Sequence, residues 1–243
     1  MSRRIVFTIL VILAGSSVFA QADTVITPKK APSVTLPRSN DHFMFQMGYA
    51  TWQGAPDSVN TNGVPRSINV YFLFDYPFKT NPRLSTAIGA GIATDNIYFK
   101  ETYIDLKENA TTLRFQNVSD TNHFKKYKFA TAYVEAPIEL RYRSDPENDG
   151  KSFKAAIGAK VGLLLDAHTK GKTLQDKNDN TFISYTLKEK SKKFLNTNRI
   201  SLTGRVGYGH FTFFTSYQLT PLFKEGLAST IHPMTLGLTI SGL

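Results

Sequence analysis

Eight segments of this chain alternate apolar and polar side chains with a period of two residues, and each alternation runs over nine or more residues. This is the pattern of a β-strand that has one apolar and one polar face. The 3.6-residue periodicity of amphipathic helices is absent. We therefore expect eight strands, over residues 43–52, 67–76, 84–93, 133–143, 153–166, 199–208, 211–219 and 234–242.

The two faces of the expected strands differ sharply in chemistry. One face is apolar, with Ile88, Val161 and Leu238 as typical members, and only Thr and Gly interrupt it. The other face is small and polar, and it carries the charged residues Asp75, Glu135, Glu139, Arg141, Lys154, Lys160, Asp166, Arg199 and Arg205. A soluble barrel or sandwich buries its apolar face, whereas a membrane barrel turns it outward. The alternation alone is compatible with both.

The lengths of the connections favour the membrane barrel. Short and long connections alternate strictly along the chain: residues 77–83, 144–152 and 209–210 are short, and residues 53–66, 94–132, 167–198 and 220–233 are long. All turns then lie at one rim and all loops at the other, as in bacterial barrels with periplasmic turns and extracellular loops. The expected fold class is all-β, an eight-stranded antiparallel up-and-down transmembrane β-barrel.

The N-terminus has the features of a secretory signal peptide. Arg3 and Arg4 precede an apolar run over residues 5–14, and small residues lead to Ala20. The run is shorter than the roughly 20 residues that a membrane-spanning helix requires. We expect a signal peptide over residues 1–20, a periplasmic extension over 21–41 and the barrel over 42–243.

Composition limits the chemistry available to an exported chain. The sequence has no cysteine, which excludes disulfides and thiolate metal sites, and no cofactor is expected. The formal charge is +10. An exported protein rarely meets nucleic acid, so outer-membrane lipid and lipopolysaccharide are the expected anionic partners. The lysine-rich stretch 170–193 is expected to be a solvated extracellular loop near lipopolysaccharide phosphates.

The charged face implies an ionic network inside the barrel. An eight-stranded barrel is filled by its own side chains and leaves no channel. Ion pairing that satisfies a buried polar interior is therefore favoured over a solute-selective lumen. The network is expected to comprise Asp75, Glu135, Glu139, Arg141, Lys154, Lys160 and Arg205.

Catalysis has little support in the sequence. His168, beside Asp166, and His232 are the only histidines at plausible catalytic positions on the loop side, and no serine lies in a recognisable nucleophile motif. We expect no enzymatic activity.

Two further patterns concern the strand ends. Aromatic residues gather there, as expected for rings at headgroup depth: Tyr49, Trp52, Tyr76, Phe78, Tyr142, Tyr208, Phe211 and Tyr217. The long insert 96–128 keeps some alternation, so the third and fourth strands are expected to project beyond the membrane as a hairpin. An exposed strand edge there could bind a protein partner by β-augmentation.

The export signal, the eight strands and the closing segments Leu219-Thr220-Pro221-Leu222-Phe223-Lys224 and His232-Pro233-Met234-Thr235-Leu236-Gly237-Leu238-Thr239-Ile240 together resemble the outer-membrane β-barrel proteins of Bacteroidota, the PorT-like group. The plan is also similar to that of small OmpA/OmpX-type barrels. The resemblance implies an outer-membrane location.

The expected function is a non-enzymatic one: a structural, adhesive or secretion-accessory role carried out by the extracellular loops of a monomer. Three alternatives stay open: a small-solute pore, a lipid-modifying barrel enzyme, and a soluble lipocalin-like binder. Conductance, lipid A composition and detergent-dependent solubility distinguish among them.

Overall fold

A computed structural model describes residues 43–61 and 63–242. The expected signal peptide, the periplasmic extension and His42 lie outside the described residues. Eight strands form the barrel: β1 (Phe43–Gln53), β2 (Arg66–Pro77), β3 (Leu84–Phe99), β6 (His123–Arg143), β7 (Phe153–Gln175), β9 (Asn198–Tyr208), β10 (Phe211–Gln218) and β11 (His232–Ser241). Each of the eight expected strands is confirmed, with ends that differ by one or two residues except where a strand is extended.

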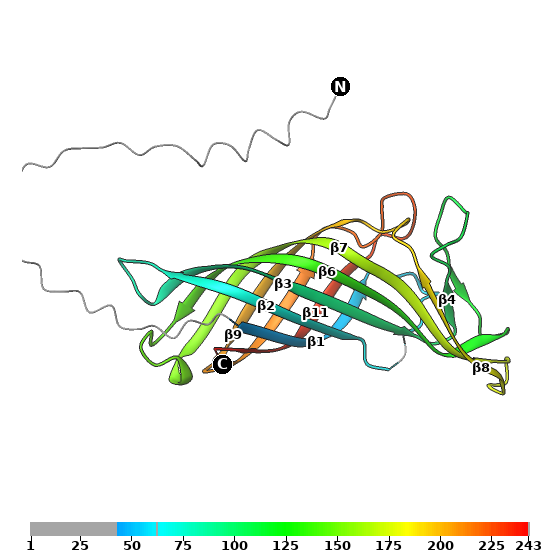
Figure 1. The fold of residues 1–243 in the computed structure, drawn as a ribbon, viewed down its shortest axis with the longest axis horizontal. Coiled ribbons are helices and arrows are strands. Elements are labelled where there is room, and N and C mark those ends of the chain that lie inside the picture. The colour runs from blue at the N-terminus through cyan, green and yellow to red at the C-terminus, as the bar shows by residue number, and fades with distance from the viewer. Residues whose placement is uncertain (1–42, 62, 243) are drawn as a thin grey trace, which may run out of the picture. The chain divides into compact units, whose positions relative to one another are not determined.

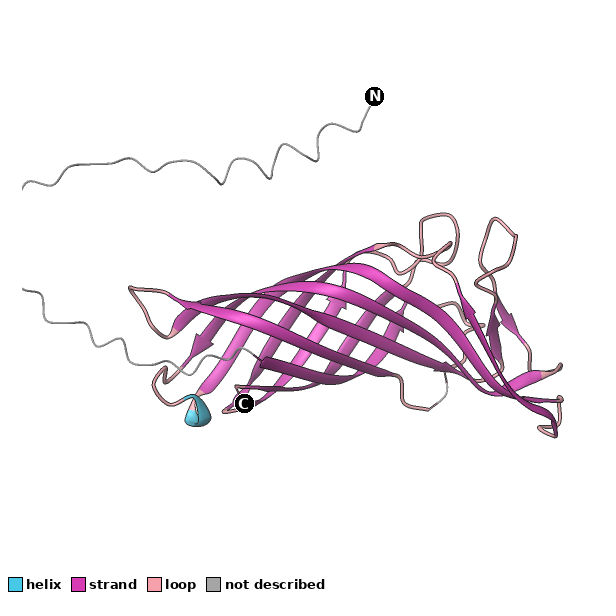
Figure 2. Ribbon diagram, in the orientation of Figure 1, coloured by secondary structure: helices cyan, strands magenta, loops and turns pink. Residues whose placement is uncertain are grey.

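The barrel strands pair antiparallel in chain order, and β11 pairs back onto β1 to close the sheet (Figures 1 and 2). Closure matters because an open edge in hydrocarbon would leave backbone N–H and C=O groups unpaired. The short connections lie at one rim; that between β6 and β7 contains a single 3-10 turn, Asp149–Lys151. Within the described part of the chain, no helix has the length and apolar character required to cross a membrane.

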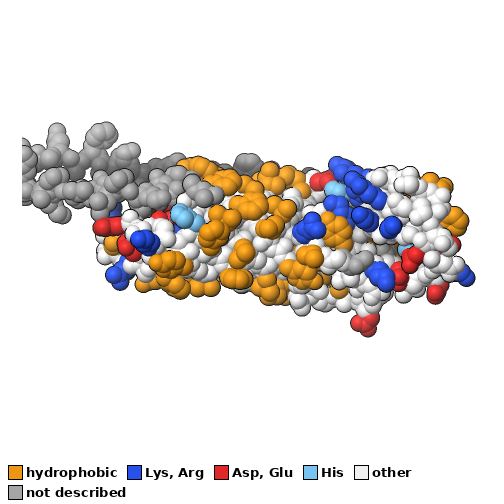
Figure 3. All heavy atoms as spheres, turned by 90° about the horizontal axis from the view of Figure 1, so that it is seen from below, with side chains coloured by type: hydrophobic (Ala, Val, Ile, Leu, Met, Phe, Trp, Pro, Cys, Tyr) orange, Lys and Arg blue, Asp and Glu red, His pale blue; other side chains and the backbone are white. Residues whose placement is uncertain are grey.

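The faces of the strands have the sidedness of a membrane barrel. Outward side chains such as Ile157 and Phe213 are 67% and 68% exposed, whereas inward Asn69 and Thr239 are buried. Figure 3 shows hydrophobic side chains over the central part of the visible face, with charged groups toward the ends. This inversion of a soluble core is what lipid contact requires.

Three strands extend beyond the rest and form a sheet outside the barrel. β3, β6 and β7 have 16, 21 and 23 residues, compared with 8–12 in the other barrel strands. The extended part of β7 pairs with a further strand, β8 (Thr181–Lys190). We call residues 95–99, 123–132 and 167–175 together with β8 the projecting sheet. The expected projection of the third and fourth strands is therefore confirmed.

The expectation of a loop over residues 170–193 is wrong for most of that stretch. β7 continues to Gln175, and β8 returns along it. Lysine is depleted in strands, so the lysine-rich composition suggested a loop. The register also shifts twice between Lys172 and Gln175, which interrupts the alternation. A separate hairpin, β4 (Thr102–Ile104) with β5 (Phe115–Asn117), forms within the connection between β3 and β6.

Asp166 and Trp52 do not lie where the sequence analysis placed them: alternation predicted an inward Asp166, and aromatic character predicted Trp52 at headgroup depth. A register irregularity at Ala132/Tyr133 leaves Leu165 as an extra residue on β7. Beyond it, Asp166 is on the outer side, where it contacts Lys190 at 3.1 Å. Trp52, expected at headgroup depth, instead packs against the buried cluster at the loop end of the barrel.

Candidate functional site

The interior of the barrel is built from rows in which large and small residues alternate. In one row the paired positions are Tyr71, Gly91, Glu135, Gly162 and Arg199, on five consecutive strands of the closed sheet. The glycines leave room for their large neighbours to meet over them. Such alternation of size is how small barrels fill their interiors.

Glu135 is the centre of the ionic cluster nearer the loop end. The Tyr71 hydroxyl donates to Glu135 Oε2 at 2.6 Å, and Arg199 Nε lies 3.3 Å from Oε1. Lys160 Nζ lies 3.8 Å from Oε2 and donates to the Tyr71 oxygen at 3.3 Å. Arg199 also binds Asp95 at 2.8 Å. Every charge in this cluster therefore has an opposite charge beside it.

Glu139 is the centre of a second cluster nearer the turn end. Arg205 donates to both carboxylate oxygens, at 3.2 and 2.7 Å, and Arg141 Nε donates to Oε2 at 2.9 Å. Two-point contact of this kind is the strongest geometry for an arginine and a carboxylate.

Asp75 links the second cluster to the turns. It lies 3.8 Å from Arg141 and 3.6 Å from Arg143. Arg143 continues to Asp149 at 3.0 Å, and Asp149 binds Lys154 at 2.7 Å. The ionic network thus reaches the short-turn rim.

The structure places all seven expected network residues inside the barrel, in two clusters and not in one. Their side chains are at most 7% exposed. The alternation did not reveal Asp149, which lies in a turn, or Asp95, which lies in a stretch expected to be a loop. Tyr71 has the correct alternation and was missed because tyrosine carries no formal charge. A cavity lined by Arg141, Arg143, Lys154 and Arg205 measures only about 10 Å³, room for about one water.

An apolar plug closes the loop end of the barrel. Trp52 is its centre, with ring centroids 5.5 Å from Phe99, 5.7 Å from Phe129 and 6.2 Å from Phe223. Buried side chains from the long connections complete it: Ile104, Leu106, Leu113, Phe194, Leu195, Leu222 and Ile231. We call this group the aromatic plug. No sequence periodicity marks these loop residues, so their burial could not be predicted from the alternation.

Each of the two candidate catalytic histidines has a hydrogen-bond partner at Nδ1. His168 Nδ1 lies 2.7 Å from Asp166 Oδ2 on the outer side of β7, and burial lowers the pKa of this imidazole despite the carboxylate. His232 Nδ1 lies 3.0 Å from the Gln218 carbonyl. Among the described residues, no group of three or more His, Asp or Glu side chains could hold a metal ion.

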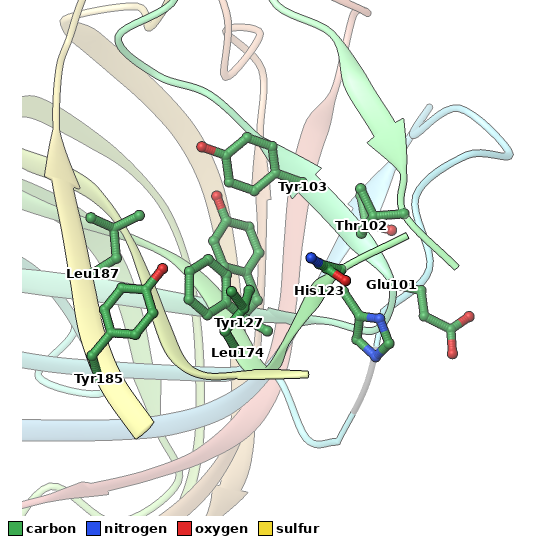
Figure 4. A pocket seen from close by; sticks show the side chains of 11 residues that line it. Glu101, Thr102, Tyr103, His123, Tyr127, Leu174, Tyr185 and Leu187 are labelled. Atoms are coloured by element: carbon green, nitrogen blue, oxygen red, sulfur yellow. The ribbon is translucent and has the colours of Figure 1, made fainter. Parts of the chain in front are cut away.

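A hollow of about 290 Å³ lies between the β4 hairpin and the projecting sheet (Figure 4). Tyr103, Tyr127 and Tyr185 face it, and His123 and Glu101 lie at its other side. The Tyr127 hydroxyl donates to the Ile104 carbonyl at 2.7 Å, and burial raises its pKa. Burial also raises the pKa of Tyr103 to about 12. Tyr103 and Tyr127 are therefore neutral phenols, and they offer the hollow ring faces and hydroxyl groups.

Comparison with known proteins gives one family and a distant similarity to solved structures. No curated protein matches the sequence. The structure of Ail, the attachment invasion locus protein of Yersinia pestis, in complex with the heparin analogue sucrose octasulfate matches with 14% identity and a TM-score of 0.32, over 82% of this chain and 96% of that one. A second structure of Ail matches with 13% identity and a TM-score of 0.30, over 82% and 95%. Residues 38–225 match the family model described as outer membrane protein beta-barrel domain, and the chain belongs to this family of outer-membrane barrels.

Proposed function

We propose that this outer-membrane barrel is a non-enzymatic recognition component of the cell envelope, with a structural, adhesive or secretion-accessory role. The observation that carries the proposal is that the interior is closed twice. The ionic network fills the membrane-spanning part, and the aromatic plug covers it at the loop end. A barrel closed in this way offers no path for a solute, which leaves its outer surfaces to make the functional contacts.

The projecting sheet is the part of the molecule best suited to recognition. It extends the longest strands beyond the apolar belt, and strand-based binding surfaces are more rigid than loops. β8 pairs with β7 along one edge, and within the described residues no strand pairs with its other edge. Phe182, Ile183 and Tyr185 on β8 are 59%, 58% and 42% exposed. These features support a protein partner that adds an extended segment at β8.

Membership of the PorT-like group of Bacteroidota belongs to the same proposal. It is supported by the strand pattern and by the closing segments of the chain. Gene neighbourhood tests it: a secretion or polysaccharide locus beside the gene is the expected result, and unrelated metabolic neighbours would count against it.

The protein is expected to be a monomer in detergent, and light scattering after size-exclusion chromatography measures its oligomeric state.

Planar-bilayer recording and lipid A analysis test the proposal together. We expect no discrete conductance steps from the purified full-length barrel, measured beside a known porin reconstituted in the same way. We also expect lipid A of identical mass in cells with and without the gene. Discrete channel events would establish a pore, and a changed acyl or phosphate pattern that returns with the gene would establish a lipid-modifying enzyme.

A further inference from the structure

A basic groove runs along the outer wall of the molecule where the barrel continues into the projecting sheet. Its volume is about 470 Å³. The residues that line it come from β2, β3, β6 and β7 and the loop before β2, and the charged ones among them are Arg66, Lys125, Lys126, Lys128, Lys170 and Lys172. Lysine and arginine side chains also gather just beyond the apolar belt in Figure 3.

The lysines lie directly opposite one another across adjacent strands. Lys128 on β6 pairs with Lys170 on β7, and Lys170 pairs with Lys188 on β8. Two residues further from the membrane on each strand, Lys126 pairs with Lys172. Paired strands are about 4.8 Å apart, and like charges in opposite positions destabilise a sheet. Repulsion between the opposed lysines is therefore expected to destabilise the sheet at these positions.

Carboxylates do not relieve the repulsion. On this face Asp166 contacts Lys190 and His168, and it lies four residues before Lys170 on β7, closer to the membrane. Within the described residues, no ion pair joins an acidic group to Arg66, Lys126, Lys128, Lys170, Lys172 or Lys188. Lys128 has one neutral partner, the Asn96 side chain at 2.6 Å. Burial and the ammonium groups of Lys170, Lys188 and Lys172 lower the pKa of Lys128.

The groove lies on the lipid-facing side of the barrel, just above the hydrocarbon layer. Arg66 lies on the same face of β2 as the outward Ile68, two residues before it and about 7 Å closer to the loop end. Lys128 lies on the same face of β6 as the outward Val134, six residues before it and about 20 Å closer to the loop end along the strand. For strands tilted by 35–45°, this places the groove from about 5 to about 15 Å above the last apolar side chains. Headgroup phosphates and the first sugars of an outer-leaflet lipid occupy this depth.

We propose that the groove binds the phosphate groups of lipopolysaccharide from the surrounding outer leaflet. The proposal rests on the proposed function and names the ligand of one of its surfaces. Unrelieved lysine rows supply the charge, the outward position makes the site accessible to a lipid neighbour, and long lysine side chains can reach down toward the phosphates. A soluble anion would need neither the lipid-facing position nor this depth.

Binding of bisphosphorylated lipid A to the purified full-length protein in uncharged detergent tests the proposal. We expect affinity at least tenfold higher than for dephosphorylated lipid A, with a marked decrease as salt increases. Lys128→Gln with Lys170→Gln is expected to weaken binding at least tenfold and to reduce the salt dependence. Lys79→Gln with Lys177→Gln removes the same charge from exposed positions outside the groove, and it is expected to change affinity less than twofold.

Three results would overturn the proposal: equal affinity for both lipids, unchanged affinity in the groove variant, or displacement of the lipid by inorganic pyrophosphate at equal concentration, which would assign the groove to a soluble anion. Heat-modifiable mobility on gels verifies that each variant is folded. If the first variant fails to fold, Lys126→Gln with Lys172→Gln removes the other opposed pair and takes its place. Bilayer conductance tests the closed barrel independently of this result.

Discussion

Tyr71 and Glu135 form a hydrogen bond of 2.6 Å across a strand that lies between them, and the residue of that strand at the crossing point is Gly91. The same relation holds on the other side of Glu135, where Gly162 separates it from Arg199. Interior charges can therefore pair over a strand because the intervening residue has no side chain.

Gly91→Ala is expected to destabilise the barrel by about 1–3 kcal/mol through overpacking. The new Cβ would lie 2.5 Å from Tyr71 Cδ1 and would also clash with the Val70 carbonyl oxygen. Gly204→Ala is the matched control, because its nearest neighbour would be 3.6 Å away. Urea unfolding in lipid vesicles measures both variants, and equal stability of the two would contradict the packing argument.

Arg205→Met is expected to destabilise the barrel by about 3–5 kcal/mol, because Glu139 keeps its charge in a buried site and loses its two-point partner. Glu139→Gln added to this variant removes the uncompensated charge and is expected to restore part of the loss. The same unfolding assay measures the double-mutant cycle. Additive losses would show that the two residues do not act as a pair.

Trp52 is the single tryptophan of the sequence, so its fluorescence reports on the aromatic plug without interference. Because it packs against Phe99, Phe129 and Phe223, phospholipids brominated in their acyl chains are expected to quench it weakly. Phe213→Trp in a Trp52→Phe background supplies a lipid-facing control that is expected to be quenched strongly. Strong quenching of Trp52 would place it in the headgroup belt and contradict the plug.

Removal of the opposed lysines is expected to stabilise the protein when no phosphate is present. Lys128→Gln with Lys170→Gln relieves cross-strand repulsion worth up to about 1 kcal/mol per pair, and the gain should shrink as salt screens the charges. Thermal unfolding in uncharged detergent at low and high salt measures it. A variant less stable than the unmodified protein at low salt would show that the opposed lysines do not repel one another enough to destabilise the sheet.

Much of the fold could be predicted because alternation and closure act over every strand. Ile88, Val161 and Leu238 face outward as expected, and the seven network charges face inward. The orientation of Trp52 could also have been read from its sequence position, since it alternates with the inward residues Met44, Gln46 and Ala50 of its strand. Because Trp52 is aromatic, it was instead expected among the rings at headgroup depth.

The remaining features depend on contacts between distant residues. The plug brings Phe194, Leu222 and Ile231 together from two loops that have no periodic pattern. The reversal at Asp166 follows from one extra residue on β7, which a single strand's sequence does not disclose. The lysine rows become visible only when the register between β6, β7 and β8 is known.

In this barrel the apolar face of each strand contacts lipid, and the charged face is enclosed. The absence of cysteine allows single spin labels at Val161→Cys and Leu163→Cys, with Ser201→Cys and Thr239→Cys as inward controls. In vesicles, the first two labels are expected to collide freely with oxygen but not with a water-soluble nickel complex, and the inward labels with neither. Outward labels that meet the nickel complex, in a protein that stays monomeric without detergent, would contradict the membrane assignment.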